Sequence, residues 1–137
     1  MFRSSVLAWL RLARVFQKID RVSEVHMRSL GLTVAQFDIL AQVGAAHGIT
    51  QQELADRLLV TKGNISQLID RMEKLGLLRR SQEKRSNILS LTEKGQELYD
   101  RVVPAQEDLV SKQFSALSAS EVDNLLHLLR KLDHALV

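Results

Sequence analysis

Several polar residues between positions 61 and 75 have the chemistry to bind a nucleic acid. Arginine can form paired hydrogen bonds with guanine, asparagine and glutamine can do so with adenine, and cationic or hydroxyl side chains can reach phosphates. The residues of these types are Lys62, Asn64, Ser66, Gln67 and Arg71. Gly63 has no side chain and would let the backbone approach a duplex closely. These residue types indicate recognition chemistry and not catalysis.

The same segment carries apolar residues at helical spacing, on the side opposite the polar ones. They are Ile65, Leu68, Ile69, Met72 and Leu75. The apolar side can attach such a helix to its own domain while the polar side enters a major groove, which is about 12 Å wide. An ordinary amphipathic surface helix would have the same two sides, so the neighbouring elements must distinguish the two interpretations.

Residues on both sides of this helix extend the predicted contact surface. Thr61 is placed to cap the helix, and the exposed amides of the first turn favour a phosphate. Gln51 and Gln52 begin the preceding helix and are expected near the phosphate backbone. Lys84 and Arg85 lie in a polar loop and are long enough to enter an adjacent minor groove.

Asp70 lies on the polar side of the helix, where a carboxylate would repel phosphate. We therefore expect Asp70 to pair with Arg85 or Lys84 and to orient the loop that carries them. The alternative is a solvated Asp70 without a partner.

Capping signals divide the chain into helices. A Ser or Thr followed three residues later by Glu or Gln is typical of a helix start, and it occurs at Thr33, Thr50 and Ser118. Glycine at positions 31 and 76 is expected to end a helix. Together with apolar periodicity, these signals predict helices at about 4–29, 33–44, 51–58, 61–75, 93–117 and 118–136, with a turn at Leu59 and Val60.

Two short strands are predicted after the fourth helix, at residues 77–80 and 87–91. The polar stretch 81–86 would join them as a hairpin loop, or wing. Pro104 should bend the next helix, or break it near Val103, because proline has no N–H to donate and clashes with the preceding turn.

The order of these elements predicts a mainly α fold of the winged helix-turn-helix type: four helices, a strand, a wing, a strand and two helices. In such a fold one helix is placed in the major groove of DNA. We expect residues 31–104 to form the DNA-binding region, and residues 1–30 and 105–137 to form a helical dimerisation region, within a single chain of 137 residues.

The two terminal helices carry more apolar surface than a short chain can cover, which favours a homodimer. The residues expected at its interface are Leu7, Leu10, Val122, Leu125, Leu129, Leu132 and Leu136. The alternative is a monomeric bundle in which these helices cover each other. A two-fold dimer predicts a pseudo-palindromic site with half-sites about one helical turn apart.

Composition excludes several other classes. With 45% hydrophobic residues the chain can bury a core, and with no cysteine it has no disulfide or thiolate metal site, which fits a cytoplasmic location. No secretory signal and no membrane-spanning apolar run is visible. Seven basic and three acidic residues from 61 to 85 give that segment a net charge of +4, against +3 for the whole chain. This concentration of charge suits a phosphate partner, although a solvated basic surface is the alternative.

Three stretches resemble the MarR family of bacterial transcription regulators: GLTVAQFDIL (31–40), TQQELADRLLVTKGNISQLIDRMEKLGLLRR (50–80) and SLTEKGQELYDRVVP (90–104). The resemblance implies an obligate homodimer whose first and last helices interlock, with one winged region on each side. The resemblance also implies that the protein represses transcription. The wing departs from the Asp-Arg-Arg common in the family: Glu83, Lys84 and Arg85 occupy those positions, and the stretch before them is a few residues shorter.

The resemblance also implies a pocket for a small aromatic or amphipathic effector that releases DNA. It would lie among the first helix, the helix at 33–44 and the helix after Thr92. Trp9, Arg14 and His26 are the residues expected to line it, although helix packing is a simpler role for Trp9.

Competing functions have weaker support in the sequence. No glycine-rich phosphate loop, H-E-x-x-H motif or cysteine nucleophile is visible, so no enzyme, cofactor or metal is expected. A winged-helix protein-interaction module that does not bind DNA is the main alternative. Membrane-surface binding by the arginine-rich first helix is disfavoured, because its arginines spread around the helix.

Overall fold

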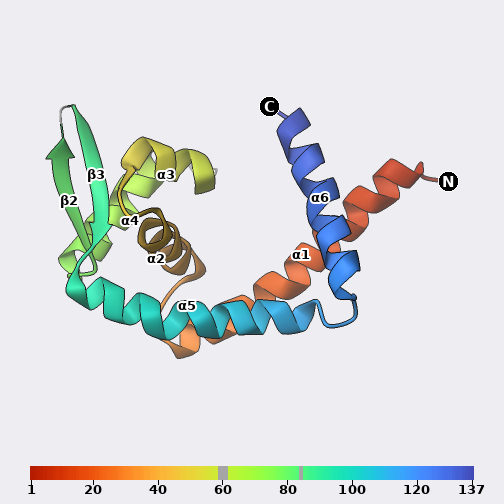
Figure 1. Ribbon diagram of the computed structural model, residues 1–137, viewed down its shortest axis with the longest axis horizontal. Coiled ribbons are helices and arrows are strands. Elements are labelled where there is room, and N and C mark those ends of the chain that lie inside the picture. Colours follow the sequence, from red (N-terminus) through yellow and green to blue (C-terminus); the bar gives the residue numbers. More distant parts are fainter. Residues whose placement is uncertain (59–61, 84) are drawn as a thin grey trace.

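The computed structural model describes residues 1–58, 62–83 and 85–137, which form six helices and a small antiparallel sheet (Figure 1). The predictions for the turn at Leu59 and Val60, and for Thr61 and Lys84, lie outside the described residues. The side chain of Lys62 and the exposure of Gly63 also lie outside what the structure describes. The mainly α, winged helix-turn-helix class predicted from the sequence is confirmed.

Helix α1 (Ser4–Ser29) begins and ends where the sequence predicts. Gly31 takes a positive φ of 76°, which lets the chain reverse so that the Leu32 N–H donates to the Met27 carbonyl at 2.9 Å. Helix α2 (Val34–Ala46) follows at once. The predicted capping box at its start is present, with Thr33 accepting from the Gln36 N–H and the Gln36 side chain accepting from the Thr33 N–H.

The helix-turn-helix consists of α3 (Gln51–Leu58) and α4 (Lys62–Lys74). The Thr50 hydroxyl accepts from the Glu53 N–H at 3.0 Å, as the second capping signal predicts. Gly76, with φ of 78°, again ends the helix, and the Leu77 N–H donates to the Met72 carbonyl at 3.0 Å.

The sheet has three strands in the order β1-β3-β2. Strand β1 (Ile49–Thr50) has only two residues and was not predicted. Strands β2 (Leu78–Glu83) and β3 (Ser86–Leu91) pair in register from Leu78 with Leu91 to Glu83 with Ser86. The predicted loop at 81–86 is therefore wrong, because the polar residues 81–83 and 86 belong to the strands. The wing is the hairpin formed by β2 and β3.

The core of the winged unit, which comprises α2 to β3, is built on the apolar side of α4. Ile65, Ile69 and Met72 are fully buried, together with Leu40 of α2 and Leu54 of α3. Leu75, predicted for the same side, is 48% exposed, because α4 ends one residue before it. The core thus fixes the rotation of α4 about its own axis.

Helix α5 (Glu93–Gln113) starts at Thr92, whose hydroxyl accepts from the Gly95 N–H at 3.0 Å. It continues through Pro104, which rules out a break near Val103, one of the two effects predicted for this proline. Helix α6 (Ala119–Ala135) follows, and its capping box joins Ser118 and Glu121 as predicted.

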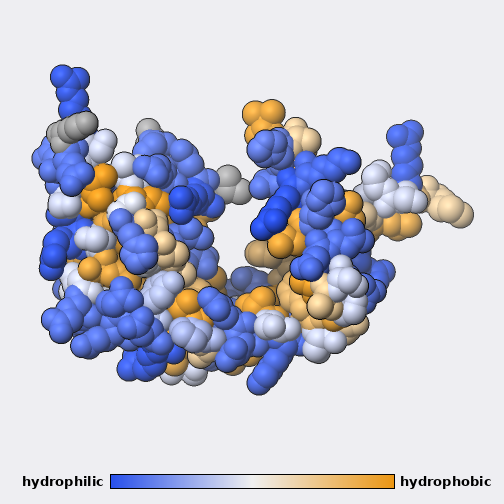
Figure 2. All heavy atoms as spheres, in the orientation of Figure 1, coloured by the Kyte–Doolittle hydropathy of each residue, from blue (hydrophilic) through white to orange (hydrophobic). Residues whose placement is uncertain are grey.

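Helices α1, α5 and α6 form a helical arm that extends from the winged unit (Figure 1). Helix α6 has no buried residue. Hydrophobic residues are visible over much of this arm in Figure 2. None of the helices in the described parts of the chain is long and apolar enough to cross a membrane.

Replacing Gly95 by alanine tests the junction between the winged unit and the arm. A Cβ at this position would overlap the Leu77 carbonyl oxygen, so backbone would have to move. We expect Gly95→Ala to lower the free energy of unfolding by about 1 to 3 kcal/mol. Urea denaturation measures the change. Glu97→Ala, a change at an exposed position two residues further along α5, is the control and should shift stability by less than about 0.5 kcal/mol. Equal stability of the two variants would contradict this packing.

Candidate nucleic-acid interface

The exposed side of α4 presents a strip of polar side chains. Asn64, Gln67 and Arg71 are exposed and lie three and four residues apart, so they share one face of the helix. Ile65, Ile69 and Met72 on the opposite side are buried. The structure therefore brings these three predicted contact residues together on the outside of the winged unit.

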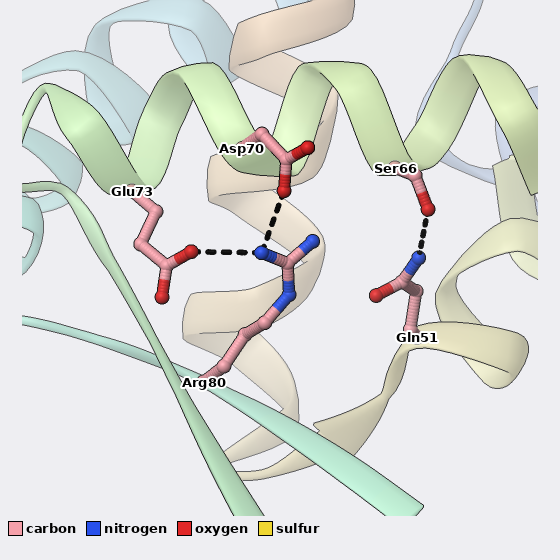
Figure 3. A network of polar contacts seen from close by, with 5 residues as sticks. All are labelled: Gln51, Ser66, Asp70, Glu73 and Arg80. Carbon is pink, nitrogen blue, oxygen red and sulfur yellow. Dashed lines mark hydrogen bonds and ion pairs between the residues drawn. The ribbon is translucent and has the colours of Figure 1, made fainter.

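A hydrogen bond ties α3 to this strip. The Gln51 side-chain amide donates to the Ser66 hydroxyl at 2.6 Å, and both residues are partly buried (Figure 3). Gln51 and Ser66 were both predicted to face a duplex. In the free protein they also position each other, so α3 and α4 present their polar residues as a single surface.

An ion-pair network joins α4 to the wing. The Arg80 Nη1 atom lies 2.7 Å from Asp70 Oδ1 and 2.7 Å from Glu73 Oε1 (Figure 3). The Arg80 side chain is 23% exposed, less than that of either carboxylate partner. This arginine holds β2 against α4 and offsets two negative charges near the polar strip.

The network corrects the predicted partner of Asp70. We expected Asp70 to pair with Arg85 or Lys84 at the wing tip, but it pairs with Arg80. The reason lies in strand alternation: Arg80 follows the buried Leu78 by two residues, so both side chains point toward the core side of β2. Asp70 and Glu73 are three residues apart and so lie on one side of a helix, and this spacing was the sequence signal for a shared cationic partner.

A polar hollow of about 370 Å³ lies between the start of the helix-turn-helix and the wing. Its lining includes the predicted residues Gln51, Gln52, Ser66 and Arg85, and it adds Ser86 and Asn87, which the sequence analysis missed. Predicting them required the pairing register of the hairpin, which places positions 86 and 87 across this hollow from residues of α3 and α4. The hollow offers amides, hydroxyls and a guanidinium to one group, which is the donor set that phosphate prefers.

The residues predicted for the dimer interface are incompletely covered. Leu7, Leu10, Leu132 and Leu136 are each about half exposed or more. Val122, Leu125 and Leu129 line an apolar groove of about 700 Å³ between α6 and the end of α5. The structure thus leaves these side chains open to a second apolar surface.

The residues predicted for an effector pocket are placed differently. A cavity of about 200 Å³ does lie among α1, α2 and α5, but Trp9 and Arg14 do not line it. Both are exposed, nearer the N-terminal end of α1. His26 is half-buried, and its Nδ1 bonds at 3.0 Å to Oε1 of Gln106, which does line the cavity. Helical periodicity could not distinguish the outer end of α1 from the part that meets α2.

A helix-turn-helix with an exposed polar strip, followed by a hairpin fixed to that helix, defines the winged-helix class of DNA-binding proteins. Sequence comparison narrows the class. A sequence model of the MarR family matches residues 30–85. A HTH-type transcriptional regulator of Bacillus cereus, itself uncharacterised, is 36% identical over 121 residues, which are 88% of this chain and 82% of the relative. The chain belongs to the MarR family.

Two further relatives are informative. MdtR of Bacillus subtilis, a HTH-type transcriptional repressor, is 28% identical, with 92% of this chain and 83% of MdtR covered. A cysteine-to-serine mutant of Escherichia coli MarR, solved in complex with operator DNA, superposes with a TM-score of 0.79 at 30% identity, covering 93% of this chain and 95% of that one. The chain is thus a DNA-binding transcription regulator.

The Arg80 network can be tested against a neighbour of equal charge. Arg79→Ala and Arg80→Ala each remove one positive charge from β2, but Arg79 is exposed and forms no ion pair within the described residues. We expect Arg80→Ala to weaken DNA binding more than Arg79→Ala does, because it releases the wing and leaves Asp70 and Glu73 unneutralised. Gel shifts measure the affinity. Urea denaturation should show a loss of about 1 kcal/mol or less for Arg80→Ala. If both variants bind DNA equally, the network does not position the wing.

Proposed function

We propose that this protein is a homodimeric repressor that binds a pseudo-palindromic operator and is released by a small effector. The observation that carries the proposal is the polar strip on α4, exposed beside a wing that Arg80 holds in place. The relative MdtR, a transcriptional repressor, supports the sign of regulation, and the MarR complex supports an operator as the target.

The proposed division of labour follows the two parts of the molecule. Residues 31–104 would bind DNA, with α4 in the major groove. Residues 1–30 and 105–137 would form the dimer. The proposed contact residues are Gln51, Gln52, Thr61, Lys62, Gly63, Asn64, Ser66, Gln67, Arg71, Lys84 and Arg85. The short connection in the wing favours backbone contacts over deep insertion into the minor groove, because few residues extend beyond the paired strands.

The arm supports the dimer. A monomeric bundle would require α6 to bury its leucines within the chain, yet α6 has no buried residue and Leu132 is 51% exposed. Large exposed apolar surfaces of this kind mark protein interfaces. Two winged units would then hang from one two-fold axis, which sets the spacing of the half-sites.

The effector proposal rests on the cavity among α1, α2 and α5. It lies where the arm meets the winged unit. A small molecule bound there would favour one angle between the arm and the winged unit. That angle would set the spacing between the α4 helices of the two subunits. A ligand shifts such an equilibrium only as far as it binds one arrangement better than the other.

Arg71 and Arg85 are the sharpest tests of the DNA surface. We expect Arg71→Ala to cost about 1 to 3 kcal/mol of operator binding if it contacts a base, and Arg85→Ala to reduce the salt slope by about 1 through loss of a phosphate contact. Gel shifts over a series of salt concentrations measure both effects, with an operator selected from random duplexes. Helicity by circular dichroism should not change, because both side chains are exposed.

The control is Arg101→Ala, a change of the same type at an exposed position on α5 that is not among the proposed contact residues. It should leave the affinity nearly unchanged. If neither Arg71 nor Arg85 affects binding, the proposed surface is wrong. If the wild-type protein shows no salt-sensitive retention at all, the protein-interaction module becomes the better hypothesis.

Leu129→Asp tests the dimer. A carboxylate in the apolar groove between α5 and α6 would have to be desolvated in an interface, so the variant should elute as a monomer with normal helicity. Gel filtration with light scattering measures the mass. Asn124→Asp adds the same charge at an exposed position of α6 outside the groove, and it should remain dimeric. A dimeric Leu129→Asp variant would show that the interface lies elsewhere.

A further inference from the structure

The cavity among α1, α2 and α5 has an apolar interior. Its walls carry Phe16, Ile19 and Met27 from α1, and Val34 and Phe37 from α2. At about 200 Å³ it is smaller than the roughly 300–1,000 Å³ of pockets for drug-sized molecules. A single aromatic ring with a short substituent is therefore the size of ligand that it suits.

The polar part of the cavity is acidic. Asp20 of α1 and Asp38 of α2 both line it, and no lysine, arginine or histidine lines it among the residues that the structure describes. Neither carboxylate has an ion-pair partner within 4.0 Å among the residues that the structure describes. Asp38 is exposed as a whole residue, but partial desolvation of its carboxylate, and secondarily the charge on Asp20, raise the pKa of Asp38. Two like charges thus face one small cavity with no counter-charge beside them.

The remaining polar wall is neutral and already hydrogen-bonded. The Gln106 amide donates to the Ser23 hydroxyl at 2.9 Å, and its carbonyl oxygen lies 3.0 Å from His26 Nδ1. Because an amide oxygen can only accept, His26 Nδ1 carries the proton in this arrangement. Gln106 and Ser23 are both more than nine-tenths buried. The network joins α1 to α5 and presents no positive charge to the cavity.

We propose that this cavity binds a small aromatic cation, with the ring among the apolar side chains and the ammonium group between Asp20 and Asp38. The inference rests on the effector cavity of the proposed function and assigns the charge of its ligand. An ammonium group can hydrogen-bond to both carboxylates, while Phe16 and Phe37 can add cation–π attraction. An aromatic carboxylate would meet only negative charge and would be excluded.

Three probes of nearly equal shape test the charge preference: benzylammonium, benzyl alcohol and benzoate. Isothermal titration calorimetry of the full-length protein at pH 7 measures each affinity. We expect benzylammonium to bind at least about tenfold tighter than benzyl alcohol, since hydrogen bonds to charged groups are stronger than neutral ones. Benzoate should show no saturable binding. Benzoate binding as tightly as benzylammonium would overturn the proposal.

Matched variants locate the site. Asp20→Asn and Asp38→Asn should each weaken benzylammonium binding about tenfold and leave benzyl alcohol unaffected. Glu107→Gln removes a negative charge beside Gln106 but outside the cavity, and should change neither affinity. Unchanged benzylammonium affinity in both aspartate variants would refute the site. That result is also expected if a second subunit supplies an arginine that neutralises Asp20 and Asp38.

Asp38→Asn should weaken ligand binding but increase the stability of the ligand-free protein. This combination separates a ligand-binding carboxylate from one that only stabilises the fold. A raised pKa means that folded Asp38 binds a proton more tightly than the unfolded chain does, so its charge makes stability fall as pH rises through that pKa. Asp38→Asn should therefore raise the midpoint of thermal unfolding at pH 7, and this gain should disappear in acid where Asp38 is protonated. A lower midpoint at pH 7 would contradict the unpaired carboxylates.

Gel shifts in the absence of the aromatic compounds test DNA binding separately from the charge preference of the cavity. Normal operator binding by a protein that ignores benzylammonium would overturn only the charge assignment. Benzylammonium binding by a protein that does not retain DNA would support the site and overturn the proposed function.

Discussion

Burial of one side of α4 is the constraint on which the rest of the structure depends. Ile65, Ile69 and Met72 have no exposed surface, and they anchor the helix to α2, α3 and the sheet. Each such side chain contributes roughly 1.5–3 kcal/mol on burial, far more than the exposed polar residues can contribute to folding. Packing therefore sets the rotation of α4, and the polar strip faces outward as a consequence. Contact residues can then vary without changing the fold.

The same argument explains the ion pairs around Arg80. A hairpin of two short strands is only marginally stable by itself. Its inner residues Leu78 and Leu89 bury apolar surface, but the outer half, from Ser81 on, has no core to pack against. Arg80 stands at the boundary between these halves, where its guanidinium can bridge to α4 at 2.7 Å from two carboxylates. The value of this pair lies in geometry, because ion pairs this exposed add little stability.

The sequence predicted the features that depend on local chemistry. Capping boxes at Thr33 and Ser118, and the glycines at 31 and 76, located helix ends because a few adjacent residues determine them. Features that depend on tertiary pairing were missed. The two-residue strand β1, the extension of β2 to Glu83 and the inward direction of Arg80 all follow from partners distant in the sequence. The continuous α5 shows the reverse case, in which tertiary context tolerates the proline that local rules predicted would interrupt it.

The candidate site follows the same division. Residue types and helical spacing predicted Gln51, Ser66, Gln67 and Arg71 as contact residues, because hydrogen-bonding chemistry and the face of a helix can both be judged from the sequence. Ser86 and Asn87 could be found only once strand register placed them around the same hollow as residues of α3 and α4. The predicted effector residues Trp9 and Arg14 do not line the cavity among α1, α2 and α5, for a related reason. Trp9 and Arg14 have suitable chemistry, but their position along α1 decides whether they meet α2, and periodicity carries no information on that distance.

Unpaired charge in the cavity stands in contrast to the paired charge at the wing. Around Arg80, a cation offsets two carboxylates that would otherwise repel DNA. Around Asp20 and Asp38, the described residues supply no such cation, and partial desolvation raises the pKa of Asp38. A chain that neutralises one acidic pair and leaves another exposed to its own repulsion has retained a destabilising arrangement. Such local departures from good packing and charge balance concentrate at functional sites, because a bound partner can supply what the folded chain lacks.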